Sequence, residues 1–144
     1  MNSIQILHIS DMYLGEDSDA TRVLMRQLCA AIQEATYEQD VPIVLLSGDL
    51  VASGKEREYE LVEEFLLEPL RQFASTRNSI VVSAPGNFDL DCDEGLPINW
   101  NALGAERQRG LFQDDERGRK IRASRARAFE QYSNFLARNN IVGV

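Results

Sequence analysis

Three short apolar runs alternate with two longer segments in which apolar residues recur every three or four positions. The runs cover residues 3–10, 42–47 and 79–84 and have the length of β-strands. The intervening segments, 18–39 and 56–74, have the periodicity of amphipathic helices. This alternation predicts an α/β fold in the order β-α-β-α-β, with right-handed crossovers and helices on one or both faces of a parallel sheet.

The middle run, PIVLLS at 42–47, is apolar throughout, which is typical of a central parallel strand covered on both faces. Three parallel strands leave two unpaired edges, and such edges invite pairing with another chain. We therefore expect the sheet to be completed by a partner chain, by a second copy, or by a continuation beyond Val144. The closing run at 140–144 resembles the start of a further strand and favours a continuation.

The helical segments have predicted inward faces. Asp17 or Ser18 is expected to cap the first helix, and Pro69 to kink or interrupt the second, because proline lacks an amide donor. Residues 90–118 are predicted to be a loop before a last helix over 119–139. The expected inward residues are Leu24, Leu28, Ala31, Ile32 and Ala35, then Tyr59, Val62, Phe65, Leu66, Leu70 and Phe73, then Ile121, Ala128, Phe129, Tyr132, Phe135 and Leu136.

The charge of the chain is unevenly distributed. At 144 residues it fits one domain, and its net charge is −8. Residues 1–100 carry 18 acidic and 6 basic side chains, whereas 101–144 carry 5 and 9. The acidic part argues against nucleic-acid binding by the whole domain.

Six of the basic residues fall within 117–127, at the start of the last predicted helix. Cations at a helix N-terminus oppose the helix dipole, so local stability does not explain them. We expect Arg119, Arg122 and Arg125 to pair with the acidic body or an acidic partner, or else to contact a nucleic-acid or nucleotide phosphate.

The sequence begins without a basic segment followed by an apolar core, and it contains no apolar stretch long enough to span a bilayer. We therefore expect a cytoplasmic protein without a membrane partner. Cys29 and Cys92 match no disulfide or zinc spacing and are predicted to be free thiols.

Oxygen-bearing side chains follow each predicted strand. Asp11, Asp49 and Asn87 come just after the three apolar runs. If the strands are parallel neighbours, these residues meet at the carboxyl edge of the sheet, where ligands bind in open α/β folds. Carboxylate and amide oxygens are ligands of hard cations, so the pattern predicts a metal site. Tyr13 and Phe88, which stand beside these oxygens, are not ordinary metal ligands.

The segments ILHISDMYLG, LLSGDLV and APGNFD resemble the D-x-H, G-D and G-N-H-[DE] blocks of the calcineurin-like metallophosphoesterases. The resemblance covers residues 4–89. It implies a sandwich of two sheets flanked by helices, of which this chain would hold the N-terminal half, and a two-metal centre that activates water for phosphoester hydrolysis. By resemblance, Asp11 would hold the first metal, Asp49 would bridge both metals, and Asn87 would hold the second.

Two histidines of these blocks are replaced. Tyr13 stands at a metal-ligand position, and Phe88 stands where the resemblance implies the catalytic histidine. A neutral phenol is a poor ligand, and a benzyl group cannot transfer a proton. His8 is the only histidine in the chain, and no counterpart of the later G-H-x-H block is present. The remaining oxygens suit Mn²⁺ or Mg²⁺ rather than Zn²⁺, with weak affinity.

We therefore expect a metallophosphoesterase-like domain with impaired or lost activity that serves as a regulatory or binding module of a larger protein or assembly. One alternative is an active phosphohydrolase completed by sequence or a partner beyond residue 144. Another is a nucleic-acid-binding module that uses segment 117–127.

Three further motifs are assigned structural roles. His8 is expected to be buried and hydrogen-bonded. The loop from Asp89 begins like an EF-hand but has Glu94 and Trp100 at the glycine and glutamate positions, so we expect a solvated acidic turn. Gly54-Lys55 lacks the other residues of a nucleotide-binding P-loop.

Overall fold

The computed structural model describes residues 4–91, 93 and 116–144. Most of the loop predicted at 90–118, including Cys92, lies outside these residues. The elements are β1 (Ile6–Ser10), α1 (Asp19–Ala35), β2 (Ile43–Ser47), α2 (Glu56–Val62), the π-helix η1 (Glu63–Leu67), α3 (Glu68–Gln72), β3 (Ile80–Ala84), α5 (Glu116–Ala128), α6 (Glu130–Asn139) and β4 (Val142–Gly143).

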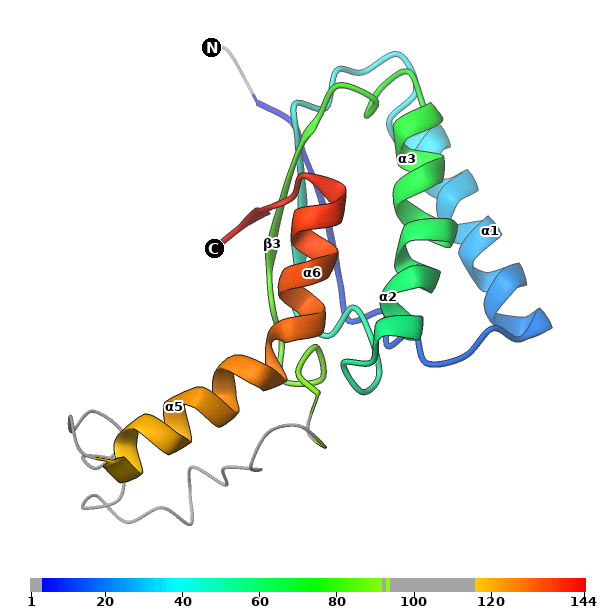
Figure 1. The fold of residues 1–144 in the computed structure, drawn as a ribbon. Helices are drawn as coiled ribbons and strands as arrows, with labels where there is room; N and C mark the ends of the chain where they lie inside the picture. Colours follow the sequence, from blue (N-terminus) through cyan, green and yellow to red (C-terminus); the bar gives the residue numbers. More distant parts are fainter. Residues whose placement is uncertain (1–3, 92, 94–115) are drawn as a thin grey trace.

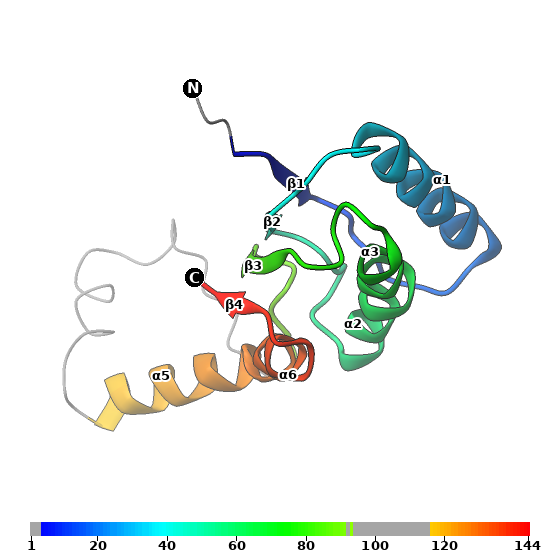
Figure 2. The same ribbon diagram turned by 90° about the horizontal axis from the view of Figure 1, so that it is seen from above.

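The strands form one parallel sheet in the order β1-β2-β3-β4. Each crossover therefore moves one position in the same direction along the sheet. Right-handed crossovers of this kind place every connecting helix on the same side. Figures 1 and 2 show α1, the α2–α3 segment and α6 on one face. The predicted α/β class is confirmed.

The hydrophobic core lies between this face and the helices. Val44 and Leu46 of β2 are buried beneath the helices. Tyr59 of α2 stacks on Phe135 of α6, with ring centroids 5.0 Å apart. The hydroxyl of Tyr132 donates to Ser83 Oγ at 2.9 Å. Together these contacts join α2, α6 and β3 around one core.

Helix α1 begins where the sequence predicts but presents a different face. Ser18 is the N-cap, and its hydroxyl accepts a hydrogen bond from the amide of Thr21. The buried residues are Met25, Cys29 and Ile32, whereas Leu24 is 62% exposed. The predicted stripe through Leu24, Ala31 and Ala35 was wrong, because apolar residues occur on more than one side of this helix and only packing selects among them.

Pro69 alters the second helical segment through a π-turn. An α-helix would place the carbonyl of Phe65 opposite the amide that proline lacks. The chain instead forms η1, which ends two residues before Pro69, and the Phe65 carbonyl accepts a hydrogen bond from the Cys29 thiol of α1 at 3.3 Å. The predicted interruption at Pro69 is thus a change of helix type. Cys29 is a buried free thiol.

The helix predicted over 119–139 is divided at Phe129 into α5 and α6. Helix α6 lies against the sheet, whereas α5 extends away from it (Figure 1). Asn140 ends α6 in the left-handed conformation, with φ of 54°. The chain then enters β4, which pairs with Val82 and Ser83 of β3. No helix among the described residues is long and apolar enough to cross a membrane.

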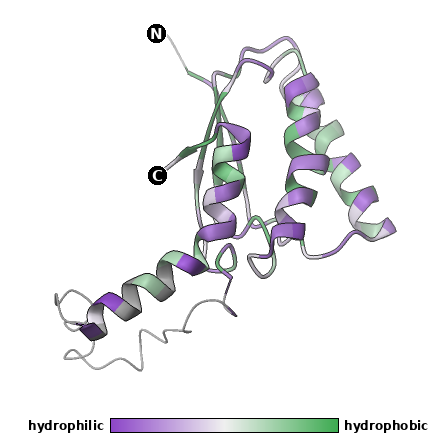
Figure 3. Ribbon diagram, in the orientation of Figure 1, coloured by the Kyte–Doolittle hydropathy of each residue, from purple (hydrophilic) through white to green (hydrophobic). Residues whose placement is uncertain are grey.

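The opposite face of the sheet has no helix on it among the described residues, and we call it the open face. Its rows follow the strand register. Ile6, Ile43 and Ile80 align in one row, and His8, Leu45, Val82 and Val142 form the next. Apolar colour runs along the strands in Figure 3.

Several apolar residues of the open face are well exposed: Ile6 is 56%, Ile80 60% and Val142 51% exposed. On this face of β2, Ile43 and Leu45 are only partly buried, so full cover of 42–47 on both faces is not observed among the described residues, whereas the predicted central place of this strand in the parallel sheet is confirmed. The prediction of a buried His8 was wrong. His8 is exposed on this face, and its Nε2 lies 2.6 Å from Ser47 Oγ.

Candidate metal centre

The loops that follow β1, β2 and β3 meet at the carboxyl edge of the sheet. Asp11 comes directly after β1, and Asp49 is the second residue after β2. The amide of Asp11 donates to the Gly48 carbonyl at 3.1 Å, and the amide of Tyr13 donates to the Asp49 carbonyl at 3.0 Å. These bonds continue the pairing of the first two strands into their loops.

Three residues at this edge adopt backbone angles that favour glycine. The φ angles of Asp11, Tyr13 and Asp49 are 55°, 49° and 50°. A left-handed conformation at a non-glycine residue is unfavourable and is held in place by its surroundings, often at functional sites. Here the interloop backbone bonds hold it. This strain sets the direction of all three side chains.

Both carboxylate oxygens of Asp49 already accept hydrogen bonds within the protein. The hydroxyl of Tyr13 donates to Oδ2, and the backbone amide of Phe88 donates to Oδ1, each at 3.0 Å. Gly86 permits this approach, because a Cβ atom at that position would lie 2.1 Å from Asp49 Oδ1. Asp49 therefore joins the loops after β1 and β3.

The rings of Tyr13 and Phe88 pack on each other beside Asp49. Their centroids are 5.3 Å apart at 76°, an edge-to-face arrangement, and the two residues are 47% and 43% exposed. The hydrogen bond to Asp49 raises the pKa of the Tyr13 phenol, with smaller contributions from burial and the nearby carboxylates. The Tyr13 phenol is therefore protonated and neutral at physiological pH, and it acts as a hydrogen-bond donor.

Asp11 and Asn87 are both exposed at the same edge. Neither side chain makes a hydrogen bond to another described residue. Across residues 4–91, 93 and 116–144, no group of three or more histidine, cysteine, aspartate or glutamate side chains is arranged to hold a metal ion. The assignment of Asp11, Asp49 and Asn87 as metal ligands remains a prediction.

Asp89 supports the edge from inside. It is fully buried, and its carboxylate accepts hydrogen bonds from the amides of Leu50, Val51 and Gly86. Burial raises the pKa of this carboxyl, and the three amide bonds oppose that shift. The hydroxyl of Tyr59 donates to the Asp89 carbonyl at 2.6 Å. Asp89 thus fixes the loops that carry Asp49 and Asn87.

The acidic segment after Asp89 is exposed at Asp93 but not at Asp91, and residues 94–100 of the predicted turn lie outside the described residues. Asp91 is buried, and Lys55 Nζ lies 2.6 Å from its carboxylate and 2.7 Å from that of Asp93. Gly54 packs directly on this segment, since an added Cβ would lie 2.3 Å from the carbonyl carbon of Leu90. The complementary charges of Lys55 and the acidic run are the sequence signal for this contact.

Comparison with known families agrees with this geometry. The model of the calcineurin-like phosphoesterases matches residues 4–143. The chain belongs to the calcineurin-like phosphoesterase family. No curated protein matches the chain.

The calcineurin-like blocks are thus retained in part. The family model spans the loops that carry Asp11, Asp49 and Asn87. However, the family's two-metal centre does not fit the donors present here. Tyr13 offers a neutral hydroxyl already bonded to Asp49, and His8 is bonded to Ser47 on the open face. The Nε2 atom of His8 reaches the last residue of β2, but among the described residues no imidazole bonds Asp11, Asp49 or Asn87.

The basic segment of this calcineurin-like chain lies in α5. Arg119 is exposed, whereas the side chains of Arg122 and Arg125 lie outside the description. Their predicted contact with an acidic partner or a phosphate is not tested.

Proposed function

We propose that this chain is a calcineurin-like phosphoesterase domain with impaired or lost hydrolytic activity, and that it serves as a regulatory or binding module of a larger protein or assembly. The hydrogen bonding of the Asp49 carboxylate is the main observation behind this proposal. Its oxygens accept hydrogen bonds from Tyr13 and Phe88, so a bridging metal would compete with the phenol and the amide for this carboxylate.

The aromatic replacements support the same conclusion for the chemistry. Phe88 cannot donate or accept a proton, and loss of a positioned acid or base costs about 10²–10⁴-fold in rate. Asp11, Asp49 and Asn87 offer only oxygen donors. A divalent metal held by them would be Mn²⁺ or Mg²⁺ rather than Zn²⁺, and it would bind weakly.

Hydrolysis of bis(p-nitrophenyl) phosphate with Mn²⁺ tests the enzymatic part. We compare the unmodified protein, Asp49→Ala, and a double variant with Tyr13→His and Phe88→His. We expect background rates from the first two, and tighter Mn²⁺ binding with a higher rate from the double variant. Mn²⁺-dependent turnover in the unmodified protein that disappears in Asp49→Ala would instead establish an active phosphohydrolase.

The open face supports a role within an assembly. Ile6, Ile80 and Val142 are each at least half exposed and lie in adjacent register rows. Contiguous apolar surface of this kind marks interaction sites. We propose that a further polypeptide covers it, either a continuation of the chain, a partner chain or a second copy.

Light scattering after size exclusion tests the second-copy form of this proposal. Ile80→Lys places a charge on the open face, and Leu24→Lys places one on the outer side of α1 at almost the same exposure, 60% against 62%. Association that is lost only in Ile80→Lys supports a second copy. A monomeric parent excludes a second copy, which leaves a continuation or a partner chain.

A further inference from the structure

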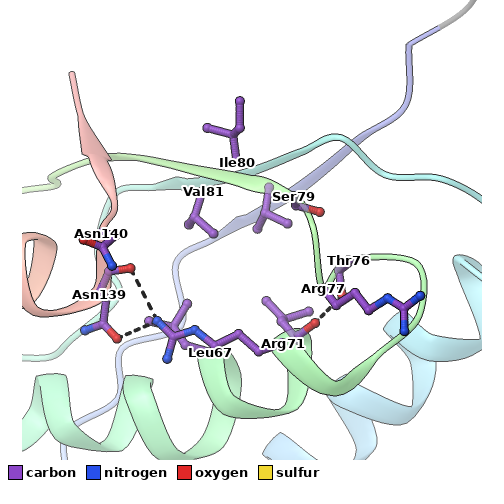
Figure 4. A pocket seen from close by; sticks show the side chains of 11 residues that line it. Leu67, Arg71, Thr76, Arg77, Ser79, Ile80, Val81, Asn139 and Asn140 are labelled. Atoms are coloured by element: carbon purple, nitrogen blue, oxygen red, sulfur yellow. Dashed lines mark hydrogen bonds between the residues drawn. The ribbon is translucent and has the colours of Figure 1, made fainter.

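A cavity of about 310 Å³ lies at the amino edge of the sheet, opposite the candidate metal centre. It is lined by the η1–α3 segment and the turn after it, by the amino ends of β2 and β3, and by the turn between α6 and β4. Figure 4 shows Arg71 lying along it toward Asn139, with Arg77 on the other side. Its volume lies at the lower end of the range for small-ligand pockets.

The cavity is cationic within an acidic part of the chain. Arg71 and Arg77 are two of the six basic residues in the first 100, and no carboxylate lines the cavity. Three of the other four, namely Arg22, Lys55 and Arg57, form ion pairs with carboxylates. Neither Arg71 nor Arg77 forms an ion pair with any described carboxylate. Their charges are therefore available to an external anion.

Arg71 is held in position while most of its donors remain available. Its Nη2 donates to the side-chain and backbone oxygens of Asn139, at 2.8 and 3.4 Å. Both bonds use neutral acceptors and the same nitrogen, so the other guanidinium donors can contact a ligand. Fixing the arginine before binding reduces the entropy that a ligand must overcome.

The other residues that line the cavity are either apolar or hydroxyl-bearing. Leu67, Leu70 and Val81 form an apolar floor. Thr76 and Ser79 are also present, but their hydroxyls already donate to the carbonyls of Leu70 and Val41. The cavity therefore offers an apolar surface beside guanidinium groups. An inorganic ion would use only the latter.

We propose that this cavity binds a small organic anion, with a carboxylate or phosphate group on Arg71 and an apolar body on Leu67, Leu70 and Val81. Arg77 is exposed, and in Figure 4 its side chain points away from the Arg71 guanidinium, so we assign it only a smaller, longer-range contribution to the site. This site is independent of the centre at Asp49.

Calorimetric titration with phenyl phosphate and benzoate tests the proposal, with phenol and inorganic phosphate as probes that lack the charge or the apolar body. We expect saturable binding of at least one aromatic anion and at least tenfold weaker binding of phenol and inorganic phosphate. Arg71→Gln should weaken binding by about tenfold or more, because it removes the charge-assisted hydrogen bond to the anion. Arg77→Gln should weaken binding by less. Arg26→Gln, which removes an exposed arginine of α1, is the matched control.

Absence of saturable binding, full affinity in Arg71→Gln, or an equal loss in Arg26→Gln would overturn the proposal. A second measurement does not depend on the folding of Arg71→Gln. In the unmodified protein, amide NMR shifts during titration should centre on residues 76–81 and 139–141. Shifts centred on residues 11–14 and 86–89 would place the anion at the other edge and contradict this assignment.

Discussion

Asp49 and Asp89 occupy neighbouring loops at one edge of the sheet, yet they belong to different environments. Asp89 is fully buried and accepts three backbone amides, whereas Asp49 is partly exposed and accepts a phenol and one amide. The first forms a support beneath the loops, and the second is part of an exposed chemical edge. The conformation of the loops depends on the buried Asp89. Exposed residues around Asp49 can therefore be replaced by residues of different chemistry while the loops keep their conformation.

Asp89→Ala should have the largest effect on stability. It leaves three backbone amides without acceptors, two of them buried and that of Gly86 partly buried, and we expect the free energy of unfolding to fall by about 3 kcal/mol or more. Urea denaturation measures this. Asp40→Ala, at an exposed loop position, should change it by less than about 0.5 kcal/mol. Equal effects of the two substitutions would remove the distinction between support and edge.

Gly86→Ala should have the second-largest effect on stability, because Gly86 lies where the loops held by Asp89 meet the exposed residues around Asp49. The added Cβ would lie 2.1 Å from Asp49 Oδ1 and 2.4 Å from the Asp49 amide nitrogen. We expect a loss of about 2 kcal/mol from the resulting backbone shift. Gly143→Ala is the control, since its Cβ would meet only the end of the Leu136 side chain. A larger loss in the control would contradict the assigned role of Gly86.

The double variant with Tyr13→His and Phe88→His should change stability by only about 1 kcal/mol, since both rings are nearly half exposed and their edge-to-face contact is a modest contribution. Thermal unfolding without added metal gives this value. A loss as large as that of Asp89→Ala would mean that the rings belong to the support.

The smallest effect concerns a buried group away from both loops. Burial raises the pKa of the Cys29 thiol above its ordinary value of 9.0. Its contribution to stability is complete below the pKa of the unfolded thiol and is lost as the pH rises through the folded value. The unfolding free energy of the parent should therefore decline slightly more steeply above pH 9 than that of Cys29→Ala. An identical pH dependence of the unfolding free energy in the two proteins would show that burial does not raise the pKa of this thiol.

The sequence was sufficient for features that depend on short apolar runs and local chemistry. The strands β1, β2 and β3, the Ser18 cap and the meeting of Asp11 and Asp49 at one edge all follow from such patterns. The family also follows from them, because its blocks combine a strand with the loop residue after it.

The remaining features depend on contacts between distant segments. The inward face of α1 is set by the packing of Met25, Cys29 and Ile32 against other segments, which a helical pattern does not contain. The burial of Asp91 depends on Lys55, 36 residues earlier. Similarly, the hydrogen bond from Tyr13 to Asp49 requires two loops to be in place before either side chain has a partner. The periodicity of apolar residues cannot predict contacts between residues that are far apart in the sequence.

The strand order β1-β2-β3-β4 has a consequence for how the chain acquires its structure. Each strand pairs only with the strands made just before and just after it, so each new strand finds its partner already synthesised. Successive β-α units can be added in the order of synthesis as the chain emerges from the ribosome, although each pairing closes a long crossover, of 32 residues before β2 and before β3 and of 57 residues before β4. The growing edge of the sheet then moves steadily from the N-terminal to the C-terminal strand.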